Sequence, residues 1–373
     1  MNKYIFVSGL LLALTALSGC NNSNPHSSST TPDQSATTAS TFATSVATPA
    51  GTPEVTTGET TSIDDTLGKD RTAKDDDPTQ APPNSPPQLI VNDETPPPSK
   101  PLPPFTVKEE ITTFLVNGQK VVGTLAVPEG TGPAPVILVF HGYTGSRDAN
   151  LVAGTGGESL FSRAARLWAT EGYASLRIDF RNSGESDGIW ADTTFDGQID
   201  DAIAAVAFLQ IDKRVDGKRI AAVGWSQGGL VASALAAKTP ALRAVGLWNA
   251  VTVPPLTYSL ILGPQALKDG PAAANKLVGR TGLKGSFFQG IYTIDPVAEI
   301  ARYDGPLFVA AGTNDSVVAP QPQMGNLFLK YHEGIEELWV RDMDHGFDKD
   351  RSAAVVDEMA KATLTLLRKG LDK

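Results

Sequence analysis

Ser226, Asp315 and His345 are the residues whose types and order along the chain could carry out chemistry. A serine hydroxyl becomes a nucleophile when a positioned base removes its proton and a carboxylate orients that base. Ser226 lies in a Gly-x-Ser-x-Gly pattern, with a short apolar run before it and good helix formers after it. A sharply turned nucleophilic serine requires this succession of strand, turn and helix. The sequence therefore predicts that Ser226 attacks acyl carbonyl groups and forms an acyl-enzyme.

A second Gly-x-Ser-x-Gly match surrounds Ser186. The strand predicted at 173–180 ends several polar residues before this serine, and no helix begins at it. Because the pattern without its structural context is a weak signal, we expect Ser186 to lie in a loop and not to be the nucleophile.

The base must be one of four histidines. His345 follows the last predicted strand, at the sheet edge where the sites of open α/β sheets gather. His332 lies near a predicted helix end, where a histidine mainly favours the helix dipole, and His26 lies in a segment with no predicted structure. His345 is the predicted base. The alternatives are that His141, which directly follows another strand, is the base, or that His345 is structural.

Asp315 is the predicted acid that orients the base. It follows the strand predicted at 307–311, so its carboxylate should emerge at the catalytic edge and accept a hydrogen bond from His345 Nδ1–H. Asp304 precedes that strand and should lie at the opposite end of the sheet. Asp344 directly precedes His345, and neighbouring side chains in an extended loop tend to point apart.

The elements that must position these residues alternate between strand and helix along residues 105–373. Continuous apolar runs are typical of strands covered on both faces. The alternation predicts an α/β domain with one doubly wound, mostly parallel sheet. The predicted strands cover 108–116, 120–127, 135–140, 173–180, a run ending just before Ser226, 242–249, 307–311 and 337–341, and helices cover 160–171, 198–210, 230–238 and 353–368.

Residues 253–296 interrupt this alternation. The segment carries two adjacent prolines, several glycines and scattered aromatic and aliphatic residues. We expect a small inserted lid whose apolar side chains line a pocket above Ser226. The alternative is a helical connection packed on the edge of the sheet.

Residues 105–373 resemble an α/β-hydrolase of the serine-esterase type. The stretch His141-Gly142-Tyr143-Thr144-Gly145 resembles the oxyanion loop of the cinnamoyl (feruloyl) esterase branch and of related acyl and peptide hydrolases. Residues 179–186 resemble the Asp-x-Arg-Gly-x-Gly-x-Ser loop of the same family, with Asn182 where glycine is usual.

This resemblance implies an oxyanion hole formed by the backbone N–H groups of Tyr143 and Gln227. It also implies hydrolysis of small-molecule carboxylic esters, with no metal and no organic cofactor. A serine peptidase of the same fold is the alternative within enzymes. Outside enzymes, the alternative is a surface-binding protein that has kept a hydrolase scaffold.

The composition of the chain argues against some classes of binding partner and metal site. The formal net charge of −10 argues against nucleic acid and other polyanions, whose binders carry basic patches. Cys20 is the sole cysteine, so the chain can form no internal disulfide and no cysteine-type zinc site.

The N-terminal residues predict a membrane anchor. Residues 1–19 have the positive and apolar regions of a signal peptide, and Leu17-Ser18-Gly19-Cys20 resembles the lipobox of bacterial lipoproteins. That resemblance implies cleavage before Cys20 and its acylation, which would place the protein outside the cytoplasm in a bacterial cell envelope. Residues 20–104 are rich in Ser, Thr and Pro and should form a disordered tether.

Replacement of Cys20 tests the anchor. Cys20→Ala should leave the activity of the isolated domain unchanged but stop partitioning into membranes, because two or three acyl chains are needed for stable anchoring. Detergent-phase partitioning of the variant and the parent measures this. Equal partitioning of the two proteins would exclude a thioether anchor.

Overall fold

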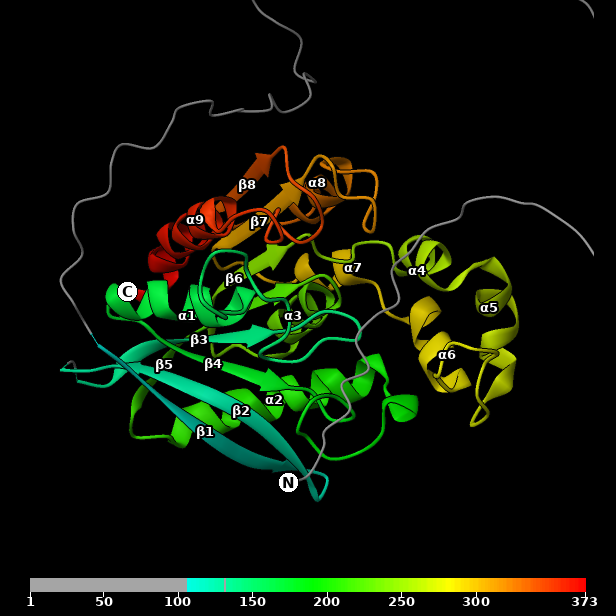
Figure 1. The fold of residues 1–373 in the computed structure, drawn as a ribbon, viewed down its shortest axis with the longest axis horizontal. Helices are drawn as coiled ribbons and strands as arrows, with labels where there is room; N and C mark the ends of the chain where they lie inside the picture. The colour runs from blue at the N-terminus through cyan, green and yellow to red at the C-terminus, as the bar shows by residue number, and fades with distance from the viewer. Residues whose placement is uncertain (1–105, 131) are drawn as a thin grey trace, which may run out of the picture. The chain divides into compact units, whose positions relative to one another are not determined.

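The computed structural model describes residues 106–130 and 132–373, and all structural statements below concern these residues. Their strands form one eight-stranded sheet with the order β1-β2-β4-β3-β5-β6-β7-β8 (Figure 1). The strands are β1 (Val107–Val116), β2 (Gln119–Pro128), β3 (Ala134–Phe140), β4 (Ala174–Asp179), β5 (Val215–Trp225), β6 (Leu242–Trp248), β7 (Leu307–Gly312) and β8 (Glu336–Arg341).

The predicted mostly parallel sheet is present, and an antiparallel hairpin lies at one end of it. β1 pairs antiparallel with β2 through a two-residue turn, in which Asn117 and Gly118 both have positive φ, as such hairpin turns require. β2 also pairs antiparallel with β4, and the pairs from β3 through β8 are parallel. The carboxyl ends of the parallel strands therefore meet at one edge, where the loops that follow them can form a site.

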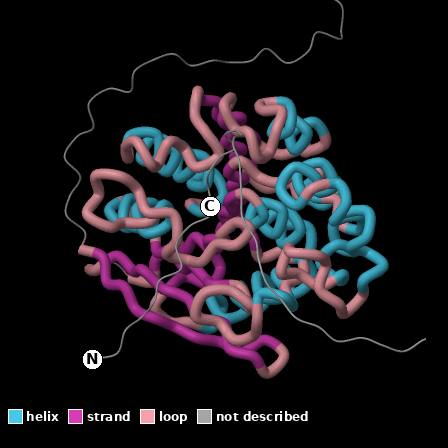
Figure 2. Tube along the Cα trace, turned by 45° about the vertical axis from the view of Figure 1, so that its right-hand side comes forward, coloured by secondary structure: helices cyan, strands magenta, loops and turns pink. Residues whose placement is uncertain are grey.

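Helices cover both faces of the sheet (Figure 2). Successive residues of β3 point to opposite faces, so Ile137 and Val139 pack with one buried cluster while Leu138 and Phe140 pack with the other. The first cluster includes residues of α1 (Leu160–Thr170) and α9 (Ala354–Leu371).

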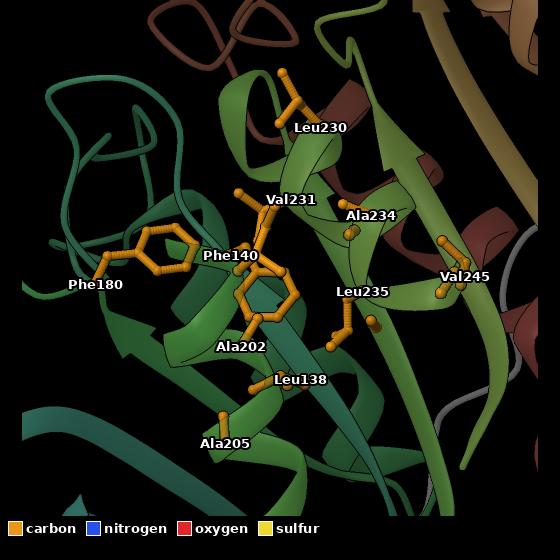
Figure 3. Packing of buried hydrophobic residues seen from close by; sticks show 14 of the residues in the cluster. Leu138, Phe140, Phe180, Ala202, Ala205, Leu230, Val231, Ala234, Leu235 and Val245 are labelled. Atoms are coloured by element: carbon orange, nitrogen blue, oxygen red, sulfur yellow. The ribbon is translucent and has the colours of Figure 1, made fainter. Parts of the chain in front are cut away.

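The second buried cluster joins the sheet to α2 (Phe195–Ile211) and α3 (Gln227–Lys238). Figure 3 shows Leu138 and Phe140 of β3 beside Ala202 of α2 and Val231 of α3. The small side chains of the two helices let their backbones approach the strands, and α2 and α3 also pack against each other.

The interruption at 253–296 contains four short helical segments between β6 and β7. They are α4 (Pro254–Leu262), α5 (Pro264–Asp269), η2 (Gly270–Ala273) and α6 (Gly285–Thr293), and α7 (Pro296–Ile300) leads back to the sheet. In Figure 1 the segments α4 to α6 gather to one side of the sheet. They pack mainly on one another, α6 also contacts α2, and α7 packs against α3.

The apolar side chains of this insert differ in burial. Tyr258, Phe287 and Phe288 are fully buried, whereas Leu260 and Tyr292 are 59% and 54% exposed. Scattered apolar residues in helices of nine residues do not show in advance which face is buried. A cavity of about 570 Å³ lies within the insert, lined by residues of α4, α5 and the loop at 277–281. Whether the insert acts as a lid stays a prediction.

Cys20, the signal peptide and the tether at 20–104 lie outside the described residues, so these predictions are untested. In the part of the chain that the structure describes, no helix is long and apolar enough to cross a membrane.

The turn between β5 and α3 is the tightest constraint on the backbone. Ser226 has φ 56° and ψ −119°, in a region that a residue with a side chain rarely adopts. A Cβ atom on Gly224 would clash with the carbonyl oxygen of Gly228, and one on Gly228 would clash with the carbonyl oxygen of Phe140. The turn therefore requires glycine both two residues before and two residues after the serine.

Gly224→Ala should destabilise the domain by about 1–3 kcal/mol, because an added methyl group forces backbone atoms of the turn apart. For a domain of this size, each kcal/mol corresponds to a fall in Tm of about 2–4 °C. Gly132→Ala is the matched control, since its Cβ would meet nothing within 4 Å. Equal Tm values for the two variants, measured by calorimetry, would contradict this description of the turn.

Candidate active site

Ser226 is held at the carboxyl edge of the sheet by its own backbone. Its N–H donates to the carbonyl oxygen of Trp248 at 2.9 Å, and its carbonyl oxygen accepts from the N–H groups of Gly229 and Val251, each at 3.0 Å. These bonds join the ends of β5 and β6 to the first turn of α3. The strained conformation, which costs about 1–3 kcal/mol, is thus fixed by three neighbouring segments.

His345 lies in the loop after β8. Its Nδ1 is 2.7 Å from Asp315 Oδ2, so Nδ1–H donates to this carboxylate and the Nε2 lone pair is left as the basic position. The carbonyl oxygen of His345 accepts from Trp225 Nε1 at 2.9 Å, and the two rings lie 5.2 Å apart. Trp225 directly precedes Ser226, so His345 is hydrogen-bonded to, and in ring contact with, the residue next to the candidate nucleophile.

The Asp315 side chain is fully buried. Its Oδ1 accepts from the N–H groups of Val317 and Val318 at 2.8 and 2.9 Å, and its Oδ2 accepts from His345. Both oxygens are therefore paired with donors, and the backbone bonds hold the carboxylate in one orientation. The expected hydrogen bond between Asp315 and His345 is present.

Asp344 has a different set of partners. Its Oδ1 accepts from the N–H groups of Gly346 and Asp348 at 2.8 and 3.0 Å, which folds the loop around His345. Asp304 precedes β7 and therefore lies at the opposite end of that strand from Asp315.

His141 uses both ring nitrogens inside the protein. Nδ1 donates to the carbonyl oxygen of Gly142 at 2.8 Å, and Nε2 accepts from the N–H of Phe180 at 3.3 Å. Burial lowers the pKa of His141, which keeps the ring neutral. This arrangement braces the loop at 141–145 and leaves His141 no free nitrogen for proton transfer.

Both ring nitrogens of His332 also have partners inside the protein. Its Nε2 is 2.9 Å from the carbonyl oxygen of Gly305, and its Nδ1 is 3.1 Å from Glu336 and 3.2 Å from the N–H of Gly334. These contacts tie the start of β7 to the start of β8, away from the carboxyl edge of the sheet.

Two backbone N–H groups remain available near Ser226. A Cβ on Gly142 would lie 3.1 Å from Ser226 Cβ, so the chain at Tyr143 passes beside the serine. Gln227 is the first residue of α3, where N–H groups face outward and the helix dipole favours negative charge. Among the described residues, the N–H groups of Tyr143 and Gln227 donate to no protein acceptor.

Aromatic side chains surround Tyr143. Its ring lies 5.2 Å from Trp190, 5.8 Å from Tyr258 and 6.1 Å from Phe287. Burial raises the pKa of Tyr143 to about 12, so its hydroxyl stays protonated near neutral pH. Tyr258 and Phe287 are fully buried, so the insert packs against Tyr143 with side chains that are closed to solvent.

Ser186, the serine of the second Gly-x-Ser-x-Gly pattern, has a structural role. Ser186 Oγ donates to the carbonyl oxygen of Asp179 at 2.7 Å and accepts from the N–H of Val122 at 2.8 Å. It lies in a loop, as predicted, and no helix begins at it. Asn182 has φ 71°, which explains why glycine suits this position, and Asn tolerates that conformation.

Buried ion pairs hold the loops at this edge. Asp179 pairs with Arg147 and also accepts from the backbone N–H groups of Arg147 and Glu185. Asp201 pairs with Arg181, yet burial outweighs this attraction and raises the pKa of Asp201 to about 6. The first pair joins the end of β4 to the loop after β3, and the second joins the loop after β4 to α2.

Asn249 was not recognised in the sequence. Its Oδ1 accepts from the N–H of Gly312 at 2.9 Å, and its Nδ2 donates to the carbonyl oxygens of Asp344 and His345 at 3.2 and 3.1 Å. One buried amide thus joins the ends of β6 and β7 to the histidine loop. A polar residue directly after an apolar strand was the available signal.

No cluster of three or more His, Cys, Asp or Glu side chains suited to a metal ion occurs among residues 106–130 and 132–373. That the reaction needs no metal or cofactor stays a prediction.

Residues 117–252 match the family described as X-Pro dipeptidyl-peptidase (S15 family). This segment includes Ser226 and Tyr143 but neither Asp315 nor His345. The quorum-quenching protein AidA of Acinetobacter baumannii (strain MDR-ZJ06) is 30% identical over 165 residues, which cover 42% of this chain and 51% of that protein. The chain spans between about a third and a half of the length of such curated relatives, 34% and 51% in two cases.

Solved structures match more of the chain. Est1E from Butyrivibrio proteoclasticus with ferulic acid bound is 22% identical with a TM-score of 0.57, covering 68% of this chain and 99% of that one. The α/β-hydrolase GrgF from Penicillium sp. sh18 is 17% identical with a TM-score of 0.55, covering 72% of this chain and 100% of that one. The sheet order agrees with the fold that these structures share, and the chain has the α/β-hydrolase fold.

Proposed function

We propose that this chain hydrolyses carboxylic esters through an acyl-enzyme on Ser226, with His345 as the base and Asp315 as the residue that orients it. The observation that carries the proposal is the 2.7 Å hydrogen bond from His345 Nδ1 to Asp315, which leaves Nε2 as the basic atom of a histidine fastened beside Ser226. This arrangement suits removal of the serine proton.

The proposed reaction has two halves. Ser226 Oγ attacks the acyl carbon while His345 Nε2 takes its proton, and the oxyanion accepts hydrogen bonds from the N–H groups of Tyr143 and Gln227. When the tetrahedral intermediate collapses, the imidazolium gives its proton to the departing alcohol oxygen. Water then attacks the acyl-enzyme with the same histidine as base, which releases the acid and restores the serine. Loss of one oxyanion donor typically costs about 2.7–4 kcal/mol of transition-state stabilisation.

An ester substrate is favoured over a peptide by the surroundings of the serine. Tyr143 and Trp190, whose rings lie 5.2 Å apart, are only partly buried and offer an aromatic surface at the proposed oxyanion loop that suits an apolar or aromatic acyl group. A structural relative with ferulic acid bound is consistent with this substrate class.

A serine peptidase is the second candidate, supported by the match of residues 117–252 to a dipeptidyl-peptidase family. Matched aryl ester and X-Pro arylamide substrates distinguish the two, since a peptidase would cleave the amide at a comparable rate. We also propose that acylated Cys20 and the tether hold the domain at a membrane outside the cytoplasm.

Replacement of each candidate serine tests the nucleophile. Ser226→Ala should lower ester turnover about 10⁶-fold, as loss of the nucleophile does in a comparable triad. Ser186→Ala should keep most of the turnover, because Ser186 bonds only to the backbone of β2 and β4. Steady-state kinetics on an aryl ester gives both values. An inactive but folded Ser186→Ala beside an active Ser226→Ala would reverse the assignment.

Asp315→Asn tests the acid. The amide keeps the shape of the side chain but favours the wrong histidine tautomer, which lowers turnover about 10⁴-fold in the serine-protease template. Asp344→Asn is the matched control and should stay within about tenfold of the parent, a loss of roughly 1.4 kcal/mol. Turnover and Tm are measured for both variants. Near-normal turnover of Asp315→Asn with a crippled Asp344→Asn would contradict the assignment.

A further inference from the structure

A chain of three buried polar side chains lies beside the turn that carries Ser226. The Tyr258 hydroxyl donates to Gln227 Oε1, and Gln227 Nε2 donates to Gln198 Oε1 at 2.7 Å. Tyr258 is 0%, Gln227 1% and Gln198 2% exposed. The three side chains come from the insert helix α4, from α3 and from α2, so three separate elements meet at this amide.

Gln227 has two separate roles in this geometry. Its backbone N–H is the proposed oxyanion donor, and its side-chain amide is paired at both ends with buried partners. Because leaving a buried polar group unpaired is costly, these bonds hold the side chain in one conformation. The side chain and the N–H belong to the same residue, so fixing one restricts rotation of the other.

Tyr258 also contacts the second donor residue. Its ring lies edge-on to Tyr143 at 5.8 Å and packs against Phe195 at 5.7 Å and Phe287 at 5.2 Å. Tyr258 therefore makes a hydrogen bond to Gln227 through its hydroxyl and a ring contact with Tyr143. Burial raises the pKa of Tyr258 well above its usual range, which favours the protonated hydroxyl that donates to Gln227.

We propose that Tyr258 is a positioning residue that aligns both oxyanion donors, so that the insert at 253–296 completes the oxyanion hole. This inference rests on the proposed function. Its consequence is that correct seating of α4 is required for catalysis and not only for substrate choice.

Misaligned donors weaken transition-state binding more than substrate binding, because full negative charge on the carbonyl oxygen exists only after attack. Loss of the Tyr258 hydroxyl should therefore lower kcat and leave KM nearly unchanged. The expected fall is about 10- to 100-fold, below the 10²–10³-fold that removal of a whole oxyanion donor costs.

Tyr258→Phe is the primary test, since it removes the hydroxyl and keeps the ring. Tyr303→Phe is the matched control, because the Tyr303 hydroxyl is buried with no hydrogen-bond partner among the described residues and lies next to Gly305 before β7. Both variants are compared with the parent for kcat, KM and Tm on an aryl ester. The affinities for an alkyl boronic acid, which forms a tetrahedral adduct, and for the free acid product are also measured.

The proposal predicts that Tyr258→Phe lowers kcat and weakens boronic acid binding by similar factors. Affinity for the acid product and the KM should stay near the parent values, and Tyr303→Phe should match the parent throughout. If Tyr258→Phe does not fold, Gln198→Met removes the other partner of the Gln227 amide and must give the same selective loss.

Two results would overturn the proposal. One is an unchanged kcat in folded Tyr258→Phe, and the other is an equal weakening of boronic acid and product binding, which would mean general damage to the site. An inactive parent, or an active Ser226→Ala, would instead refute the proposed function, so the two failures are distinguishable.

Discussion

The left-handed conformation of Ser226 is the constraint on which the rest of the site depends. A residue with a side chain adopts this conformation at a cost of about 1–3 kcal/mol, so the surrounding structure must hold it. The hydrogen bonds from Ser226 to Trp248, Gly229 and Val251 do so, and Gly224 leaves space for the first turn of α3. The same turn points the N–H of Gln227 outward, so the position of the nucleophile and that of the oxyanion donor have one cause.

Parallel pairing brings the remaining groups to this turn. β5, β6, β7 and β8 end at one edge, and the loops after the last two carry Asp315 and His345. Buried polar side chains then fix the relative positions of these loops. Asn249 joins the strand ends to the histidine loop, and the Gln227 amide joins α3 to α2 and to the insert. Fully paired buried groups of this kind specify one arrangement because any slip leaves a group unpaired.

The sequence predicted the parts that depend on local pattern and on topology. The apolar runs predicted the parallel strands, and the glycines around Ser226 predicted the turn. The position of Asp315 after β7 predicted its hydrogen bond to His345. The partners of Asn249 and Tyr258 could not be predicted, because they lie on elements that meet only in the folded chain. That Tyr258 is buried and Leu260 is exposed could not be predicted either, since a short helix does not reveal which side it buries.

The acyl-enzyme on Ser226 is the central claim of this account, and trapping it is the most direct test. The domain is mixed with excess aryl ester, quenched in acid within the first turnovers, digested and examined by mass spectrometry. The account predicts an added acyl mass on the peptide that contains Ser226, formed together with a burst of about one equivalent of released phenol whenever deacylation is the slower half. Where deacylation is fast, the same adduct should accumulate in an equally quenched reaction of a slowly deacylating carbamate ester. Full ester turnover with the acyl or carbamoyl mass on another residue, or with no adduct under either condition, would contradict the account.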